Sequence, residues 1–189
     1  MLKYLSDYIF TIYVAMAVVV ILTCVGIVIH NQNQIAIQED VNITVIEEVK
    51  VNPTVIMITR LNPKVDKDVA LVIANSIEKY TEKYNLSIPL VIALMYRESG
   101  FRPIIISKAN CIGLMQINPK AHPEKVKPYK RYQLFHIDVN VSIGCQILSQ
   151  YLIKRKGNVK KALQNYLGAN NTGYLIDVLS TCVELGINK

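Results

Sequence analysis

The pattern of apolar and polar positions divides this chain of 189 residues into three parts. The first part contains residues 9–29, "IFTIYVAMAVVVILTCVGIVI", which include no charged residue. As a helix rising ~1.5 Å per residue, this run can cross a hydrocarbon layer of ~30 Å. It is longer than the apolar core of a signal peptide and lacks a clean small-x-small cleavage site. Residues 1–30 are therefore predicted to form a cytoplasmic tip and a transmembrane anchor, in preference to a cleaved signal peptide.

The second part, residues 31–63, has no helical period. Val41, Ile43 and Val45 alternate with polar residues, and Asn52-Pro53 interrupts the pattern before a further apolar run. Alternation and breakers of this kind are typical of short strands or extended chain. We expect an extended stalk here rather than a separate domain.

The third part, residues 64–189, is predicted to be one mainly α domain. From Asp66 onward, apolar residues recur at helical spacing with Lys and Glu between them. Ser87 is a plausible N-cap for a helix through "LVIALMYRE", which is too apolar for a surface helix and should be central. Asp138 can cap another helix, and "VKKALQNYL" and "YLIDVLSTCVEL" fit two more. Two prolines make residues 120–131 an expected irregular segment.

The distribution of charge bears on orientation and partners. The α-amine and Lys3 precede the apolar run, and no Lys or Arg follows it until Lys50. The positive-inside rule then places the N-terminus in the cytoplasm and the domain outside, in the periplasm. The formal net charge of +7 lies in this exported part, because Lys3 and Asp7 cancel. A basic exported domain suits an anionic wall or membrane surface. The sequence lacks the motifs that indicate nucleic-acid binding.

The cysteines give no sign of a metal site. Cys24 lies in the apolar run, which leaves Cys111, Cys145 and Cys182 at spacings that fit no metal motif. Buried thiols are the favoured interpretation, and one disulfide among the three stays open. No metal or other cofactor is expected.

The candidate for chemistry is Glu98, which follows an apolar helix in "MYRESGFRP". A carboxylate against an apolar wall is costly to ionise, and such a carboxyl suits general-acid work on a glycosidic oxygen. A common glycoside hydrolase needs a second carboxylate about 5–9.5 Å away. The nearest candidates are Glu124, in the basic segment, and Asp138, at an expected helix cap.

Four stretches in order extend this interpretation: "ESGFRP", "SKANCIGLMQINP", "LFHIDVNVSIG" and "ALQNYLGANNTGYLIDVL". Together they resemble the soluble-lytic-transglycosylase (SLT) family of lysozyme-like domains over most of residues 85–182. The family pattern is E-S-x-F-x-P, S-x-x-G-A-x-G-L-M-Q, N-I-x-x-G, then A-Y-N-x-G and a following Tyr. The chain departs from it at Asn110-Cys111, where Gly-Ala is usual, and at Leu167, where Asn is usual.

The resemblance implies a lysozyme-like fold and a peptidoglycan lytic transglycosylase. In that chemistry one glutamate, here Glu98, acts as acid and then as base on the β-1,4 bond between MurNAc and GlcNAc. The 6-hydroxyl of the sugar attacks and leaves a 1,6-anhydromuramoyl product, without a metal. The resemblance also implies five substrate-binding residues, namely Ser107, Met115, Gln116, Asn118 and Tyr166. Ser107 is expected to bond the glutamate or the substrate, and the Tyr166 hydroxyl to hold the carboxyl.

Two alternatives stay open from the sequence. The first is a goose-type lysozyme-like hydrolase that cuts the same bond with water. The second is a catalytically silent wall-binding assembly protein. Leu167 supports this alternative, because it stands where the family pattern has Asn. The expected partners are peptidoglycan strands and, through residues 9–29, a lipid bilayer. A secretion or conjugation machine and a membrane-containing virion are both compatible settings.

Overall fold

The structure is a computed structural model that describes residues 23, 27, 29–32, 52–168 and 171–187. It divides into two units, Met1–Val51 and Asn52–Lys189. In the first unit, residues 29–32 are helical and exposed. Most of the predicted membrane span lies outside the described residues. Within the described part, no helix is long and apolar enough to cross a membrane.

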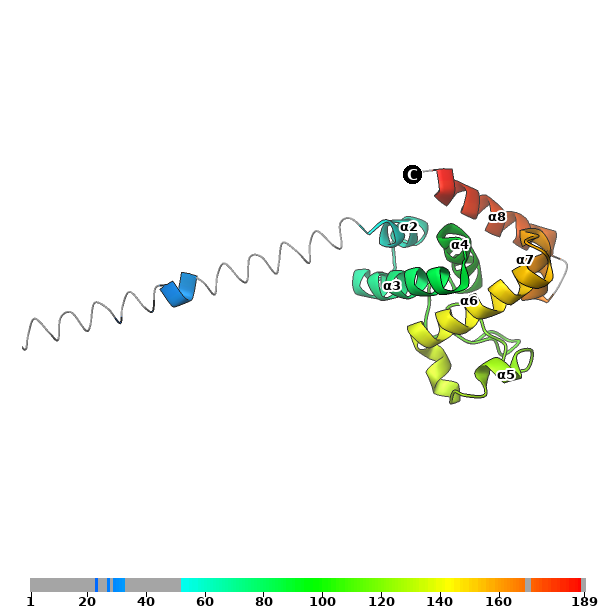
Figure 1. Ribbon diagram of the computed structural model, residues 1–189, viewed down its shortest axis with the longest axis horizontal. Helices are drawn as coiled ribbons and strands as arrows, with labels where there is room; N and C mark the ends of the chain where they lie inside the picture. Colours follow the sequence, from blue (N-terminus) through cyan, green and yellow to red (C-terminus); the bar gives the residue numbers. More distant parts are fainter. Residues whose placement is uncertain (1–22, 24–26, 28, 33–51, 169–170, 188–189) are drawn as a thin grey trace, which may run out of the picture. The chain divides into compact units, whose positions relative to one another are not determined.

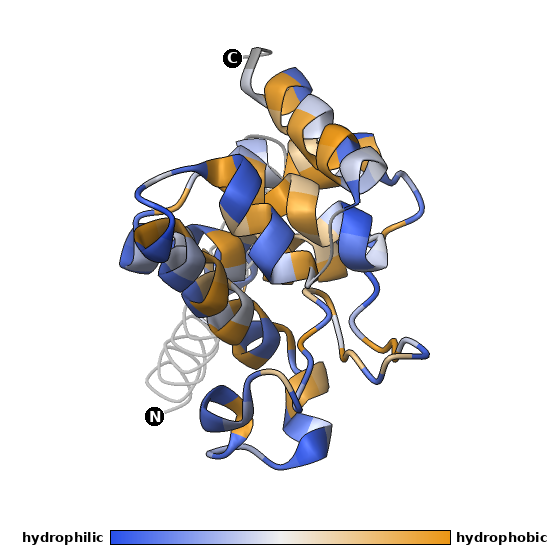
Figure 2. Ribbon diagram, turned by 90° about the vertical axis from the view of Figure 1, so that its right-hand side faces the viewer, coloured by the Kyte–Doolittle hydropathy of each residue, from blue (hydrophilic) through white to orange (hydrophobic). Residues whose placement is uncertain are grey.

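The second unit is mainly α-helical, as the sequence predicts. Its helices are α2 (Pro53–Leu61), α3 (Lys67–Tyr84), α4 (Ile88–Ser99), α5 (Pro123–Val126), the 3-10 helix η1 (Arg131–Phe135), α6 (Ile137–Lys154), α7 (Val159–Leu167) and α8 (Thr172–Ile187). The long helices pack as pairs, most closely α4 with α8, α3 with α6 and α6 with α7 (Figure 1). Hydropathy follows this packing, with apolar residues along the inner faces of the helices (Figure 2).

The prediction of extended chain over residues 31–63 is wrong for residues 31–32, which are helical, and for residues 53–61, which form α2. The Asn52 side chain accepts hydrogen bonds from the backbone N–H groups of Thr54 and Val55, at 2.9 and 3.0 Å. Pro53, which looked like a breaker, occupies the first helical turn, where a missing N–H costs nothing. Burial of Val55 and Ile58 then outweighs the strand preference of the Val and Ile residues. The domain therefore begins at Asn52 rather than at residue 64.

Two helix starts differ in detail from the prediction. Ser87 occupies the N-cap position of α4 but makes no side-chain cap hydrogen bond. Asp138 lies in the first turn of α6, whose N-cap residue is His136. The Asp138 carboxylate instead accepts hydrogen bonds from Tyr80 Oη at 2.7 Å and Lys79 Nζ at 3.0 Å. Asp138 thus joins α6 to α3 rather than capping its own helix.

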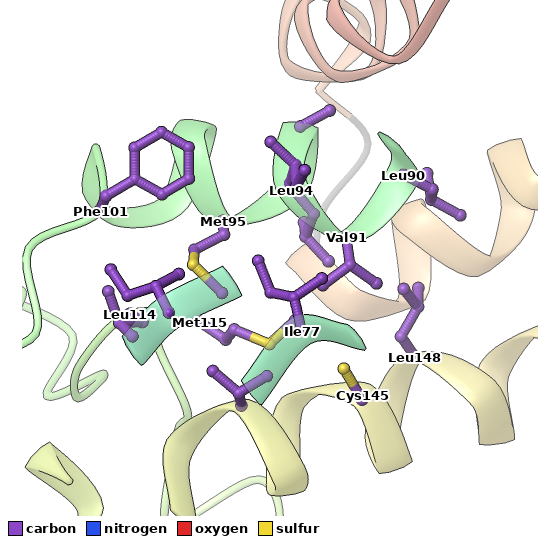
Figure 3. Packing of buried hydrophobic residues seen from close by; sticks show 14 of the residues in the cluster. Ile77, Leu90, Val91, Leu94, Met95, Phe101, Leu114, Met115, Cys145 and Leu148 are labelled. Carbon is purple, nitrogen blue, oxygen red and sulfur yellow. The ribbon is translucent and has the colours of Figure 1, made fainter. Parts of the chain in front are cut away.

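Helix α4 is central, as its composition predicts. Six consecutive residues, Leu90 to Met95, are buried, so every face of its middle turns touches protein. Figure 3 shows Met95 of α4 gathered with Leu114 and Met115 of the following loop and Ile77 of α3. Cys145 and Leu148 approach the same cluster from α6. This packing fixes the C-terminal end of α4, where Glu98 lies.

The loop after α4 is held by the buried side chain of Asn140. Asn140 Oδ1 accepts from Met115 N–H at 2.8 Å, and its Nδ2 donates to the carbonyls of Ile112 at 2.9 Å and Leu134 at 2.7 Å. Gly113 packs so closely that a Cβ would come within 2.4 Å of Asn140 Nδ2, and its φ is +75°. The "GLMQ" and "NVSIG" motifs therefore meet in the fold as two halves of one packed unit.

The cysteines of the domain are free thiols. Cys145 is fully buried, whereas Cys111 and Cys182 are half-buried. Burial raises the pKa of Cys145 to about 12, so this thiol is neutral and behaves as a small apolar side chain. The interpretation as packed thiols is confirmed for Cys145.

Candidate active site

A pocket of about 410 Å³ opens beside the C-terminal end of α4. Its lining comes from Glu98, the loop between α4 and α5, the middle of α6 and the end of α7. The lining residues are Glu98, Ala109, Cys111, Gln116, Ile117, Asn118, Ala121, His122, Ile147, Tyr151, Asn165, Tyr166, Leu167 and Gly168. Glu98 is the one carboxyl group among these residues.

Glu98 is held at a helix end that cannot continue. Gly100 adopts a left-handed conformation with φ +61° and closes α4 two residues later. The Glu98 side chain is half-buried and accepts a hydrogen bond from Tyr174 Oη. Burial raises the pKa of Glu98, and the Tyr174 hydrogen bond and the Arg97 charge oppose this only in part. The carboxyl can therefore keep a proton at a pH where an ordinary glutamate has lost it.

Tyr174 is itself oriented from α4. The Arg97 guanidinium lies over the Tyr174 ring, 5.5 Å from its centroid, and pairs with Asp177 at 3.1 Å. Asp177 stands three residues after Tyr174, so both lie on one face of α8. Successive helical residues point about 100° apart, so Glu98 faces the pocket while Arg97 reaches α8. Arg97 thereby helps to fix the turn of α8 that brings Tyr174 to Glu98.

The assignment of Tyr166 as the partner of the glutamate is wrong. Tyr166 Oη donates to the Met115 carbonyl at 2.9 Å, and burial raises the Tyr166 pKa well above 10.0. Tyr166 lines the pocket, but the hydroxyl that bonds Glu98 belongs to Tyr174. The sequence carried the signal, since Tyr174 is the tyrosine that follows the A-Y-N-x-G position in the family pattern.

Three of the five predicted substrate residues line the pocket, namely Gln116, Asn118 and Tyr166. Gln116 has a positive φ of 47°, and its Nε2 donates to the Gly113 carbonyl at 3.0 Å. Asn118 Oδ1 accepts from the N–H groups of Lys120 and Ala121, at 3.0 and 3.3 Å. Both side chains brace the loop that carries them and present polar atoms near Glu98.

The other two predicted residues do not line the pocket. Met115 is fully buried and packs against Gly144, where an added Cβ would lie 2.3 Å from its sulfur. Ser107 Oγ accepts from Cys111 N–H at 3.1 Å and braces the loop. The short β-bridges of Ile112 with Ile106 and Ile117 turn this loop inward, which buries Leu114 and Met115 together. The predicted groove position of Met115 is therefore wrong.

The comparisons with known proteins decide the family. The sequence model of the Transglycosylase SLT domain matches residues 75–174, more than half of the 189 residues. The chain belongs to the transglycosylase SLT family. The matched region of the SLT domain runs from α3 through Glu98 to Tyr174.

Curated relatives carry the name membrane-bound lytic murein transglycosylase C. The Haemophilus influenzae protein is 34% identical over 87 residues, which cover 40% of this chain and 24% of the relative. The Histophilus somni protein is 35% identical over 81 residues, which cover 39% of this chain and 22% of the relative. The match therefore spans about a quarter of the length of these relatives.

A solved structure supports the fold of the SLT domain. The X-ray structure of an inactive mutant of the lytic transglycosylase Slt from Pseudomonas aeruginosa superposes with a TM-score of 0.55 at 22% identity. It covers 60% of this chain, and the match covers 24% of that chain. The prediction of a mainly α, lysozyme-like SLT domain is confirmed.

Sequence reasoning missed three residues that line the pocket of the SLT domain. The His122 ring meets the Tyr151 ring edge-on, with centroids 6.1 Å apart. Burial lowers the pKa of His122, which favours a neutral imidazole with one donor and one acceptor. Asn165 Oδ1 accepts from Arg155 at 2.9 Å. His122 lies in a segment that the sequence predicted to be irregular, so no motif pointed to it. Asn165 lies two positions before Leu167, which replaces the asparagine of the family pattern.

None of the other acidic residues near the site belongs to the pocket lining, although the charge of Glu124 acts on the lining residues His122 and Tyr151. Asp138 pairs with Lys79, Asp177 pairs with Arg97, and Glu124 lies on α5 outside the lining. The pocket thus combines one protonatable carboxyl with neutral amide, imidazole and phenol groups. Such a set can bind a polyhydroxylated ligand and give or take one proton.

Proposed function

We propose that the SLT domain is a peptidoglycan lytic transglycosylase that cleaves the β-1,4 bond between MurNAc and GlcNAc. The observation that carries this proposal is the single pocket carboxyl, Glu98, with a raised pKa and a phenol donor, Tyr174. A reaction that needs one group to act as acid and then as base matches a pocket with one carboxyl. The relatives' names, as lytic murein transglycosylases, point to the same chemistry.

In the proposed first step, protonated Glu98 gives its proton to the glycosidic oxygen as the bond from that oxygen to C1 of MurNAc breaks. The carboxylate that remains is stabilised by the Tyr174 hydroxyl. Glu98 then takes the proton of the MurNAc 6-hydroxyl while that oxygen bonds to C1. The glutamate is regenerated in its protonated form, and the product carries a 1,6-anhydro ring.

The neutral polar groups around Glu98 are proposed to hold the sugars. Amides of Gln116, Asn118 and Asn165 can both donate to and accept from hydroxyl groups, and the His122 ring can do the same. Leu167 replaces one amide of the family pattern with an apolar contact. The loss of one hydrogen bond partner weakens sugar binding but leaves the proton chemistry of Glu98 in place.

The hydrolase alternative is less well supported, because the pocket lining offers no second carboxyl to activate water. Mass spectrometry of digested sacculi separates the two reactions, since an anhydro product is one water lighter than a hydrolysis product. We expect the wild type to release anhydro products, and Glu98→Gln to slow release by at least ~10²–10⁴-fold with unchanged circular dichroism. Parental activity in Glu98→Gln would rule out the proposed mechanism, and an inactive wild type would favour a silent binding protein.

We propose further that residues 9–29 anchor the protein in a bilayer with the SLT domain in the periplasm. The uncharged run and the placement of Lys3 before it support this orientation. A secretion or conjugation machine, or a virion with a membrane, would use such a protein to open the wall locally. A reporter that works only after export, fused behind Lys189, should be active. Activity of a cytoplasmic reporter instead would overturn the topology and leave the Glu98 chemistry untouched.

A further inference from the structure

The positive charge of the domain is concentrated in two short segments. Residues 52–187 contain 18 Lys or Arg and nine Asp or Glu. Residues 120–131 and 154–161 together hold ten of those basic residues and one of the acidic ones, Glu124. The remainder of the domain is balanced, with eight residues of each sign. The entire net charge of the domain therefore lies in these two segments, which we call the basic rim.

Both segments of the basic rim border the pocket that contains Glu98. The first contributes Ala121 and His122 to the lining. The second begins one turn after Tyr151, whose ring meets that of His122 with a centroid distance of 6.1 Å. The segment around α5, at the bottom of Figures 1 and 2, is mostly hydrophilic. The two segments thus come together where His122 and Tyr151 form one wall of the pocket.

The basic side chains of the rim are not neutralised within the described part of the chain. The ion pairs there join Lys79 to Asp138 and Arg97 to Asp177, and neither includes a residue of the rim. A cationic surface that the fold itself does not compensate attracts anions over about a Debye length, ~8 Å at physiological salt.

The two arginines of the rim are tied to the pocket border by neutral partners. Arg131 donates to Asn110 Oδ1 at 2.6 Å, between the lining residues Ala109 and Cys111. Arg155 donates to Asn165 Oδ1 at 2.9 Å, and Asn165 is itself a lining residue. A guanidinium has further N–H groups in a planar fork that matches a carboxylate. Both arginines therefore keep donors for an outside anion while they are held beside the pocket.

We propose that the basic rim binds the carboxylates of the peptides attached to the glycan, so that the domain prefers peptide-bearing strands to bare ones. The inference rests on the proposed function. The pocket lining is neutral apart from Glu98, as suits a sugar chain, while the surplus charge lies at its border. A peptide attached to a sugar in the pocket would bring its carboxylates to the rim, so one ligand would occupy both the pocket and the rim.

The test compares two triple variants of the full chain in detergent. Lys127→Gln, Lys154→Gln and Lys160→Gln remove three exposed charges from the rim. The control variant carries Lys64→Gln, Arg60→Gln and Lys67→Gln on α2, α3 and the turn between them, also exposed. The sets are matched by position, since Lys154 and Arg60 lie in last helical turns and Lys160 and Lys67 in first turns. Thermal unfolding of all proteins checks that folding is unchanged.

Each protein is assayed on peptide-bearing glycan strands and on strands stripped of peptides by an amidase. On peptide-bearing strands we expect KM of the rim variant to rise roughly tenfold with little change in kcat, because three weak exposed charge contacts are lost together. On stripped strands the rim variant, the control variant and the wild type should have the same KM. Added salt should raise the wild-type KM only for the peptide-bearing strands.

Equal KM values for the rim and control variants on peptide-bearing strands would overturn the inference alone. An equal loss on both substrates would also overturn it, since the rim would then act on the sugar chain. Loss of binding to vesicles rich in anionic lipid, without a change in KM, would assign the rim to a membrane surface instead. If the wild type cleaved neither substrate, the proposed function would fail, and this inference with it.

Discussion

Replacement of Asn140 by alanine should destabilise the SLT domain more than any surface change. Asn140 is fully buried, and its side chain satisfies three backbone groups, those of Met115, Ile112 and Leu134. A buried group left without its partner costs about 1–3 kcal/mol, so the three together predict a loss of about 3–9 kcal/mol. A domain is typically stable by only about 5–15 kcal/mol. The variant should therefore be near the limit of folding at physiological temperature.

Thermal unfolding followed by far-UV circular dichroism measures this loss. For a domain of this size we expect Tm to fall by roughly 10–30 °C. Asn158→Ala is the control, because Asn158 Oδ1 is an exposed cap that accepts one bond, from Lys161 N–H at 2.9 Å. Loss of such a cap costs about 1 kcal/mol. If Asn140→Ala cost no more than Asn158→Ala, the three buried hydrogen bonds would not hold the loop as argued.

Three further predictions follow from the site and the domain boundary. Burial raises the folded-state pKa of Glu98 above its ordinary 4.5, so the stability that this group contributes is full below pH 4.5 and is lost as pH rises through the folded pKa. In urea unfolding, Glu98→Gln should therefore have the same free energy of unfolding as the wild type near pH 4 and a higher one near pH 8. Equal free energies of the two proteins at both pH values would show that burial does not disfavour the Glu98 carboxylate. Tyr174→Phe removes a donor that lowers the Glu98 pKa, so the alkaline limb of its pH–rate profile should move to higher pH, and a downward move would refute this assignment. Removal of residues 1–51 should leave a folded domain by circular dichroism. Removal of residues 1–61 also deletes the buried side chains of Val55 and Ile58, so it should lower the free energy of unfolding by about 3–6 kcal/mol. Equal stability of the two truncated proteins would place α2 outside the core.

Most of the helical architecture follows from the sequence because its signals are local. Apolar spacing from Asp66 onward predicts α3, and the stretches "LVIALMYRE" and "VKKALQNYL" predict α4 and α7. The stretch before Asn62 was predicted incorrectly because Val and Ile favour strands in isolation. Its helix is stabilised by contacts with α3 and α4, which are distant in sequence and follow from no local pattern.

The site was predictable where chemistry depends on one residue and not where it depends on a contact between helices. Glu98 is recognisable in the sequence because it is a carboxyl residue near the end of an otherwise apolar helix. The choice between Tyr166 and Tyr174 depends on how α7 and α8 pack against α4, and both hydroxyls lie on motif positions. Only the fold shows that Tyr174 reaches the carboxyl while Tyr166 bonds the Met115 carbonyl.

The motif residues divide into those that build the pocket and the one proposed to do chemistry in it. Gly113, Met115 and Asn140 form a single packed unit, so a change in any one of them is opposed by the other two. The Tyr174 hydroxyl, whose ring lies under Arg97, orients the Glu98 carboxyl from α8. A chain could therefore keep nearly every motif for stability alone and lose only its glutamate. Burial disfavours the ionised form of Glu98, a cost that a neutral glutamine at this position would not carry. A carboxyl at a position with this cost is what the proposed acid–base chemistry requires and what a silent wall-binding domain would not need.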